Sequence, residues 1–347
     1  PCLNACIRRA DVPRSREGVA RFRPFSATKK PRYWIHAFFL ARRLFARIRR
    51  QRQVGLCGRW GLAIAPVKHF IVAMACLFLS ACSSLLYYPT HVLHFPPSRF
   101  GFEPEEVWFK NAEGTKLFGW LFRHKSGSPE GNPKGAILFY HGNGENLSSH
   151  YVSLLWTLEK GYDFFIFDYR GYGRSEGEPT PQGTVADGEA ALRWLRARYP
   201  GTPLVIYGQS LGGAVALRNA IDLKDETALK AVVIDSSFAT YQGVARRLLA
   251  RGILSWTFQW VPWIVLSDRY APNGEIGKIS PVPLLVMHAE NDATVPFRCG
   301  EEIFEQAKPP KEFWRIPGNG HTDAFLNHGD EFRKKLLIWL DGVLGSG

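Results

Sequence analysis

The residues best suited to chemistry lie in the run Gly208-Gln-Ser-Leu-Gly212. A buried apolar strand, Leu204–Tyr207, precedes this run, and a helical pattern, Leu211–Ile221, follows it. A G-x-S-x-G run between a strand and a helix is typical of a nucleophile elbow, in which a sharp turn exposes the serine hydroxyl beside a helix N-terminus. The two outer glycines suit a turn in which strand and helix nearly touch. We therefore predict Ser210 as a nucleophile; the alternative is a glycine-rich turn with an incidental serine.

A serine hydroxyl is a poor nucleophile at neutral pH, so it needs a base within hydrogen-bond reach and an acid that orients that base. Asp292 lies in a polar loop after a buried strand, and His321 follows a Pro-Gly-Asn-Gly loop. We expect His321 to open the final helix and to act as general base and then acid. Asp292 is expected to hold the imidazole tautomer and to stabilise the imidazolium.

Other residues compete for these roles. Asp235 follows a buried strand and Asp323 lies two residues after His321, so each is an alternative acid. His141 and His288 both stand at strand ends. For these two histidines we favour structural, hydrogen-bonded positions over the role of base.

The negative charge that develops on a substrate oxygen needs two preorganised donors. We predict the backbone N–H of Leu211, which follows the nucleophile, and the backbone N–H of Asn143, in the loop after strand Ala136–Tyr140. The glycines beside Asn143 also fit simple turn positions. Asn146 fits an N-cap for a helix at Ser149–Lys160.

The remaining elements alternate between strands and helices, which predicts a mostly parallel sheet. An antiparallel pair at Val107–Lys110 and Leu117–Arg123 should precede it. The expected parallel strands are Ala136–Tyr140, Phe164–Asp168, Leu204–Tyr207, Ala231–Ile234, Leu284–Met287 and Glu312–Ile316, and the expected helices are Ser149–Lys160, Thr184–Tyr199, Leu211–Ile221, Phe297–Ala307 and His321–Leu340.

Residues 107–341 resemble an α/β-hydrolase. The resemblance rests on five motifs: His141-Gly-Asn-Gly-Glu-Asn146, Asp168-Tyr-Arg-Gly-Tyr-Gly-Arg-Ser175, Gly208-Gln-Ser-Leu-Gly212, His288-Ala-Glu-Asn-Asp292-Ala-Thr-Val-Pro296 and Gly318-Asn-Gly-His321. It implies a mostly parallel central sheet with helices on both faces and a short helical insert before the acid-bearing strand. The triad order in this fold, serine, acid and histidine, matches Ser210, Asp292 and His321.

The pattern is similar to a membrane-associated branch that holds thioesterases, lysophospholipases and serine aminopeptidases. The resemblance implies a serine hydrolase that cleaves carboxylic ester or thioester bonds of small-molecule or lipid substrates through an acyl-enzyme, without metal or cofactor. Two alternatives stay open: a peptidase acting near a free N-terminus, and a non-enzymatic envelope lipoprotein that uses the fold as a binding module.

The positive charge of the chain is confined to one end. Residues 1–66 hold fourteen Arg and two Lys against Asp11 and Glu17, a net charge of +14, whereas the whole chain carries +13. The rest is therefore nearly neutral, which gives no support to nucleic-acid binding. We expect residues 1–66 to be upstream sequence outside the natural protein; the alternative is a basic arm or a transit-like peptide.

Residues 67–82 have the parts of a secretory signal. Lys68 and His69 form a short positive region, and an apolar run, Phe70–Leu79, leads to Leu79-Ser-Ala-Cys82. This end resembles a bacterial lipobox, which implies lipidation of Cys82. The expected location is the cell envelope, with the protein anchored to a membrane and facing the periplasm or the exterior. An uncleaved membrane anchor is the alternative, although the run is shorter than the roughly 20 residues needed to span a bilayer.

Residues 83–101 should form a linker that wraps onto a domain at residues 102–347. Within that domain, the insert at Arg246–Ile264 contains Trp256, Phe258, Trp260 and Trp263. It could cap an acyl pocket or enter a membrane interface. The alternative is an aromatic helix pair packed on the sheet edge. We expect no disulfide, because Cys299 is left without an intrachain partner if Cys82 is lipidated.

Overall fold

The computed structural model describes residues 87–124, 132–253 and 255–345. The predicted upstream segment 1–66, the predicted signal 67–82 with Cys82, and the first residues of the predicted linker lie outside this part of the chain. All structural statements below concern the described residues.

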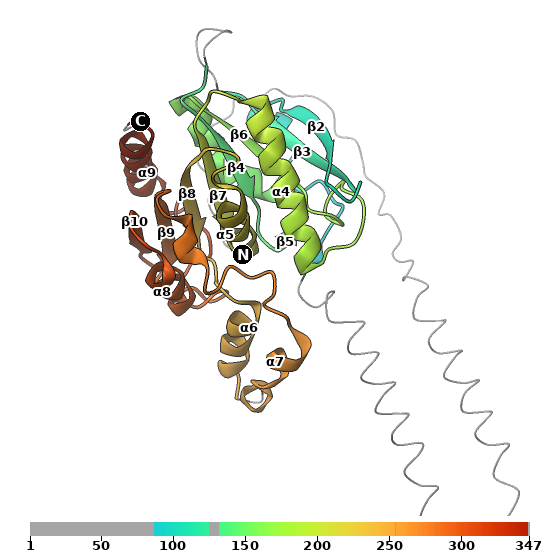
Figure 1. Ribbon diagram of the computed structural model, residues 1–347, viewed down its shortest axis with the longest axis vertical. Helices are drawn as coiled ribbons and strands as arrows, with labels where there is room; N and C mark the ends of the chain where they lie inside the picture. Colours follow the sequence, from blue (N-terminus) through green and yellow to red (C-terminus); the bar gives the residue numbers. More distant parts are fainter. Residues whose placement is uncertain (1–86, 125–131, 254, 346–347) are drawn as a thin grey trace, which may run out of the picture. The chain divides into compact units, whose positions relative to one another are not determined.

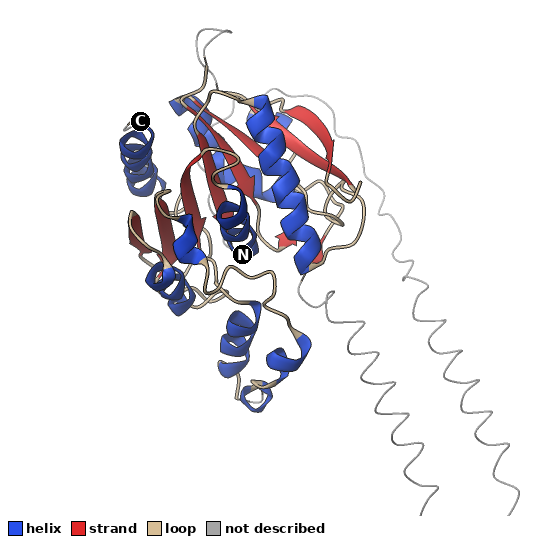
Figure 2. Cartoon of the chain, viewed as in Figure 1, coloured by secondary structure: helices blue, strands red, loops and turns tan. Residues whose placement is uncertain are grey.

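An eight-stranded sheet forms the centre of the domain (Figures 1 and 2), in the order β10-β9-β8-β7-β4-β6-β3-β2. β2 is antiparallel to β3 and β3 is antiparallel to β6, whereas the other neighbours are parallel. The mostly parallel sheet with an antiparallel start is therefore confirmed. The strands are β2 (Glu105–Lys110), β3 (Lys116–Phe122), β4 (Gly135–Tyr140), β6 (Tyr162–Phe167), β7 (Leu204–Gln209), β8 (Leu229–Asp235), β9 (Leu284–Ala289) and β10 (Lys311–Ile316).

Helices cover both faces of this sheet, which is why β4 is buried along its whole length. On one face, Leu138 of β4 shares an apolar core with α4 (Pro181–Arg198), α5 (Leu211–Leu223) and α8 (Phe297–Gln306). On the other face, Phe139 shares a second core with η3 (Tyr151–Lys160) and α9 (Gly329–Leu344). α4 and α5 lie on the near face in Figure 1.

The helix expected at Ser149–Lys160 has a different form. A short α-helix, α3 (Leu147–His150), leads into the 3₁₀-helix η3. In η3 the side chains of Ser153 and Thr157 donate to carbonyls three residues earlier, at 2.9 Å and 2.7 Å, which suits the tighter turn. Asn146 is the N-cap of α3, as predicted, and accepts from the Ser148 N–H.

The predicted linker contributes a strand to the domain. β1 (Tyr88–Pro89) pairs in parallel with β5 (Gly144–Glu145), directly after the loop that follows β4. We call residues 87–101 the lead. The side chain of Asn146 holds the lead to the domain, because Nδ2 donates to the carbonyls of Thr90 and Val92 at 3.0 Å and 2.8 Å. The lead therefore wraps onto the domain, and it also supports the loop that holds Asn143.

The predicted insert lies between β8 and β9. Its elements are α6 (Tyr241–Ala250), η4 (Trp256–Phe258), α7 (Val261–Val265) and η5 (Ile276–Ile279). Asp292 follows β9, so the helical insert precedes the acid-bearing strand as predicted.

Candidate active site

Ser210 lies at the sharp turn between β7 and α5, with φ 52° and ψ −120°. A serine rarely adopts a positive φ, so the surroundings must hold it there. The Ser210 N–H donates to the Asp235 carbonyl at 2.9 Å, and the Ser237 hydroxyl donates to the Ser210 carbonyl at 2.6 Å. Two neighbours from the end of β8 thus fix both backbone groups of Ser210.

Gly212 is required by close packing of α5 against the end of β4. A Cβ at this position would lie 2.2 Å from the Tyr140 carbonyl oxygen and 2.4 Å from that of His141. Backbone atoms cannot move aside as a flexible side chain can. The small residue therefore lets the first turn of α5 approach the loop that follows β4.

Asp292 and His321 form a direct pair. His321 Nδ1 lies 2.7 Å from Asp292 Oδ2, and the carboxylate is buried. Asp292 Oδ1 accepts from the N–H groups of Thr294 and Val295 at 2.7 Å and 2.9 Å, so its orientation is fixed. Because a carboxylate only accepts, the proton of a neutral His321 ring resides on Nδ1 and leaves Nε2 as an acceptor.

His321 lies in a loop, so the expectation that it opens the final helix is wrong. α9 begins only at Gly329. Thr322 has φ 56°, outside the helical region, and the Asp323 carbonyl accepts from the N–H groups of Leu326 and Asn327 in a separate turn. This loop lets the ring of His321 reach back to the carboxylate after β9.

The alternative acids have other partners. Asp235 accepts from the hydroxyls of Tyr207 and Ser236 at 3.0 Å and 2.9 Å, and burial raises its pKa to about 6. Asp323 accepts from Asn327 Nδ2 at 2.7 Å. Of the described carboxylates, Asp292 is the one in hydrogen-bond contact with His321.

His288 is a buried structural residue behind the acid. Its Nε2 donates to the Val295 carbonyl at 2.9 Å and lies 3.6 Å from Asp292 Oδ2. Burial lowers the pKa of His288, so a neutral ring is favoured. The ring therefore packs against the acid loop.

A pocket of about 280 Å³ brings the predicted site residues together. Ser210, His321 and Asn143 all line it, and Leu211, the first residue of α5, adjoins it in sequence. Among the described residues no hydrogen bond joins Ser210 to His321; such contacts often tighten only when substrate binds. The full lining is Tyr88, Gly142, Asn143, Gly144, His150, Gln209, Ser210, Thr294, His321 and Thr322.

The two predicted oxyanion donors flank Ser210. Leu211 provides an N–H in the first turn of α5, where no helical carbonyl is available to it. On the other side, the Cβ position of Gly142 lies 3.7 Å from Ser210 Cβ, and Asn143 is the next residue. Tyr172 steadies Asn143 by donating from its hydroxyl to the Asn143 carbonyl at 2.9 Å.

Tyr88 and His150 are pocket residues that the sequence did not reveal. Tyr88 comes from the lead strand β1, whose pairing with β5 is a long-range contact. His150 Nε2 lies 3.0 Å from the Gly144 carbonyl, and burial lowers the pKa of this ring. No local sequence pattern identifies either residue as part of a pocket. The one signal is that His150 follows the His141 loop by a few residues.

A buried acid and histidine lie behind the loop that holds Asn143. His141 Nδ1 donates to the Gly142 carbonyl at 2.7 Å, and its unprotonated Nε2 lies 3.6 Å from Asp168 Oδ1. Burial raises the pKa of Asp168 to about 7 and lowers that of His141 well below its ordinary value. Near pH 6 and below, the pair is therefore a mostly protonated acid beside a neutral ring.

We expect Asp168→Asn to change how stability depends on pH. The folded pKa of Asp168 lies above its unfolded value of 3.8, so the wild-type chain loses stability as pH rises from about 4 to 7. Asparagine does not ionise. Relative to wild type, the variant should gain about 4 kcal/mol in free energy of unfolding across that window.

Urea denaturation at a series of pH values measures this difference, and histidines common to both chains cancel from it. Asp225→Asn is the control, because the Asp225 side chain is 91% exposed. A pH-independent difference between Asp168→Asn and wild type would contradict the prediction.

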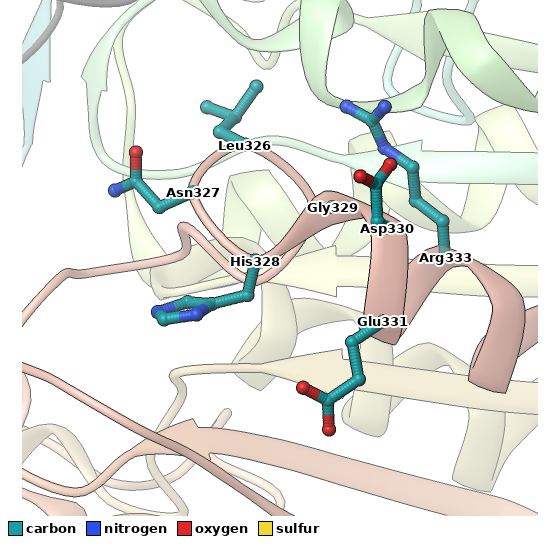
Figure 3. A pocket seen from close by; sticks show the side chains of 7 residues that line it. All are labelled: Leu326, Asn327, His328, Gly329, Asp330, Glu331 and Arg333. Carbon is teal, nitrogen blue, oxygen red and sulfur yellow. The ribbon is translucent and has the colours of Figure 1, made fainter.

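A larger depression of about 360 Å³ lies elsewhere, at the start of α9 (Figure 3). Its lining includes His328, Asp330, Glu331 and Arg333, but no serine or cysteine. This depression therefore offers no nucleophile, and its larger volume does not make it the candidate active site.

The described residues contain no group of three or more His, Cys, Asp or Glu placed to hold a metal ion. In the same residues, no helix has the length and apolar character to cross a membrane.

Comparisons with known proteins agree with this fold. The family profile Hydrolase_4, described as serine aminopeptidase, S33, matches residues 131–275. The uncharacterized protein YfhR of Escherichia coli K12 is 34% identical over 281 residues, which is 79% of this chain and 93% of that protein. The chain therefore belongs to the α/β-hydrolase superfamily.

Two other similar proteins have named activities. Lysophosphatidylserine lipase ABHD12 of Rattus norvegicus is 32% identical over 214 residues, which cover 60% of this chain and 52% of that protein. The esterase Pf2001 of Pyrococcus furiosus has a similar structure, with a TM-score of 0.57 and 20% identity over 74% of this chain and 99% of that one. At this identity the structural likeness shows the fold alone.

Proposed function

We propose that this protein hydrolyses carboxylic ester or thioester bonds through Ser210, His321 and Asp292. One observation carries the proposal: a buried carboxylate 2.7 Å from the ring of His321, which lines the same pocket as an elbow serine. This arrangement fits nucleophile, base and orienting acid in their usual roles.

The reaction has two halves. Ser210 Oγ attacks the acyl carbon while His321 Nε2 takes the hydroxyl proton, and Asp292 stabilises the resulting imidazolium. The carbon–oxygen or carbon–sulfur bond then breaks, and His321 gives the proton to the leaving alcohol or thiol. Water attacks the acyl-enzyme with His321 again as base, which releases the acid and frees Ser210.

The N–H groups of Leu211 and Asn143 would stabilise the oxyanion in both halves. Donors of this kind contribute about 2.7–4 kcal/mol each to transition-state stabilisation. Asn143 is held by Tyr172 and by the lead strand, since the Tyr88 N–H lies 3.3 Å from Asn143 Oδ1. A rigid loop of this kind suits a preorganised oxyanion site.

The pocket favours an ester over a peptide with a free N-terminus. Its described lining contains no Asp or Glu that would hold a substrate ammonium group. The sequence from Tyr241 to Ser267 in the adjoining insert also contains no acid. The name of the lipase relative adds support for an acyl ester of a lipid.

A substrate panel tests this choice. The purified chain should turn over acyl esters and matched thioesters, and it should cleave the matched aminoacyl anilide much more slowly. Faster cleavage of the anilide would favour the peptidase alternative. No turnover of any of them would favour the binding module.

We also propose lipidation of Cys82 and a place in the cell envelope. The support is the lipobox-like end of the apolar run Phe70–Leu79. Mass analysis of the N-terminal peptide of the native protein should find an acylated Cys82; an unmodified upstream terminus would reject the idea.

A further inference from the structure

The insert between β8 and β9 carries an exposed apolar surface. Its side chains are between 42% and 94% exposed, although all are large and hydrophobic. The packed aromatic pair considered from the sequence therefore does not describe these residues. We call them the insert surface: Leu248, Ile253, Trp256, Phe258, Trp260, Trp263 and Ile264.

The insert is held firmly at its base, so its apolar side chains are not exposed because the segment is loose. At the base of the insert, Thr240 caps α6 by accepting from the Gly243 N–H at 3.0 Å. Asp268 Oδ1 accepts from the Tyr241 N–H at 2.7 Å, and the Gln242 side chain donates to the Leu266 carbonyl at 2.7 Å. The two ends of the insert are tied together, and the apolar side chains point outward from a held frame.

The insert also touches the wall of the active site. The Arg251 guanidinium donates to the Asp292 carbonyl at 2.9 Å and to the Ala293 carbonyl. The next residue, Thr294, lines the pocket. The insert surface therefore adjoins the loop of the catalytic acid. Figure 1 shows α6 and α7 together, projecting from the domain away from α9.

The charges of the insert suit a lipid headgroup region. Tyr241–Ser267 contains three arginines and no acid. Arg247 pairs with Glu302, whereas Arg246 lies over the Trp263 ring at 5.0 Å and has no carboxylate partner among the described residues. Tryptophan with arginine is the composition of surfaces at the boundary between headgroups and acyl chains.

The predicted lipidation site lies close to the pocket in sequence. Cys82, the predicted lipidated residue, is six residues before Tyr88, which lines the pocket. Six extended residues span about 20 Å at most. A bilayer that held Cys82 would therefore be within reach of the pocket and of the insert beside it.

We propose that the insert surface docks on a lipid bilayer and that the pocket draws its acyl ester from that bilayer. This inference rests on the proposed ester hydrolysis. Burial of tryptophan and isoleucine side chains at the interface supplies the attraction, and the acid loop is positioned next to the docked surface.

The test uses the full chain and two esters: a soluble short-chain ester, and a long-chain ester carried in phosphatidylcholine vesicles. The variant replaces Trp256, Trp260 and Trp263 with serine, and the single change Trp256→Ser is a milder second variant. Ile338→Ser is the matched control, because Ile338 is 74% exposed on α9, outside the insert. We expect unchanged hydrolysis of the soluble ester by every variant. On vesicles we expect about tenfold or greater loss for the triple variant, a smaller loss for Trp256→Ser and no loss for Ile338→Ser.

Other outcomes overturn the inference. An unchanged vesicle rate would show that docking does not involve this surface. An equal loss on both esters would make the insert part of the pocket, and loss of a dimer in light scattering would make its partner a second copy of the chain. If wild type hydrolyses neither ester, the proposed function fails. Docking is then read separately by quenching of tryptophan fluorescence with brominated phosphatidylcholine, and equal quenching in the triple variant and Ile338→Ser rejects it.

Discussion

Ser210→Ala is expected to lower kcat for ester hydrolysis by about 10⁴ to 10⁶-fold, because no other hydroxyl takes the nucleophile's place. The same change should abolish the single adduct that a fluorophosphonate probe forms with wild type. Intact mass measures the adduct, and initial rates measure kcat. Folding should be retained, since the turn is held through the backbone of Ser210 and not through its side chain.

Ser98→Ala is the control, because Ser98 is exposed in the 3₁₀-turn η2 (Pro97–Phe100). It should keep both the adduct and the rate. An adduct that persists in Ser210→Ala would place the reactive group elsewhere. A wild-type chain that is folded but never labelled would move the binding-module alternative to the front.

Asp292→Asn is expected to lower kcat by about 10⁴-fold with little change in the fold. The asparagine oxygen still accepts from the N–H groups of Thr294 and Val295, so the loop is preserved. An amide that faces His321 donates where the carboxylate accepted, which favours the wrong tautomer of the ring.

Asp235→Asn is the matched control for Asp292→Asn. Asp235 is also buried at the end of a strand, but it accepts from Tyr207 and Ser236 and not from His321. We expect its kcat to remain within about tenfold of wild type. If Asp235→Asn lost as much activity as Asp292→Asn, the assignment of the acid would be wrong.

The central fold could be predicted because its signals are local. Continuous apolar segments such as those of β4 and β7 predict a sheet with both faces covered. Their alternation with helices predicts that the strands are parallel. The run around Ser210 predicted the strand-to-helix turn, and the structure has it at φ 52°. Each of these features depends on neighbouring residues alone.

Other features depend on contacts between distant segments, and here the predictions were incomplete or wrong. His321 was expected in a helix, yet Thr322 adopts φ 56° and the helix begins at Gly329. The ring's place is decided by Asp292, 29 residues away.

The lead and the insert show the same limit. Tyr88 reaches the pocket because β1 pairs with β5, across 56 residues, and a two-residue strand carries no pattern of its own. The sequence does not distinguish buried from exposed positions for the tryptophans of the insert, because an aromatic run has the same composition in a core and on a surface. Tertiary packing alone decided that they are exposed.

By itself, the sequence determined the sheet, the serine at its turn, and the order of serine, acid and histidine along the chain. Only the tertiary structure decided which carboxylate meets His321, which residues wall the pocket, and which apolar side chains face outward. The physical reason is that hydrophobic period and turn chemistry act over a few residues. Hydrogen bonds between loops depend instead on how the whole chain closes.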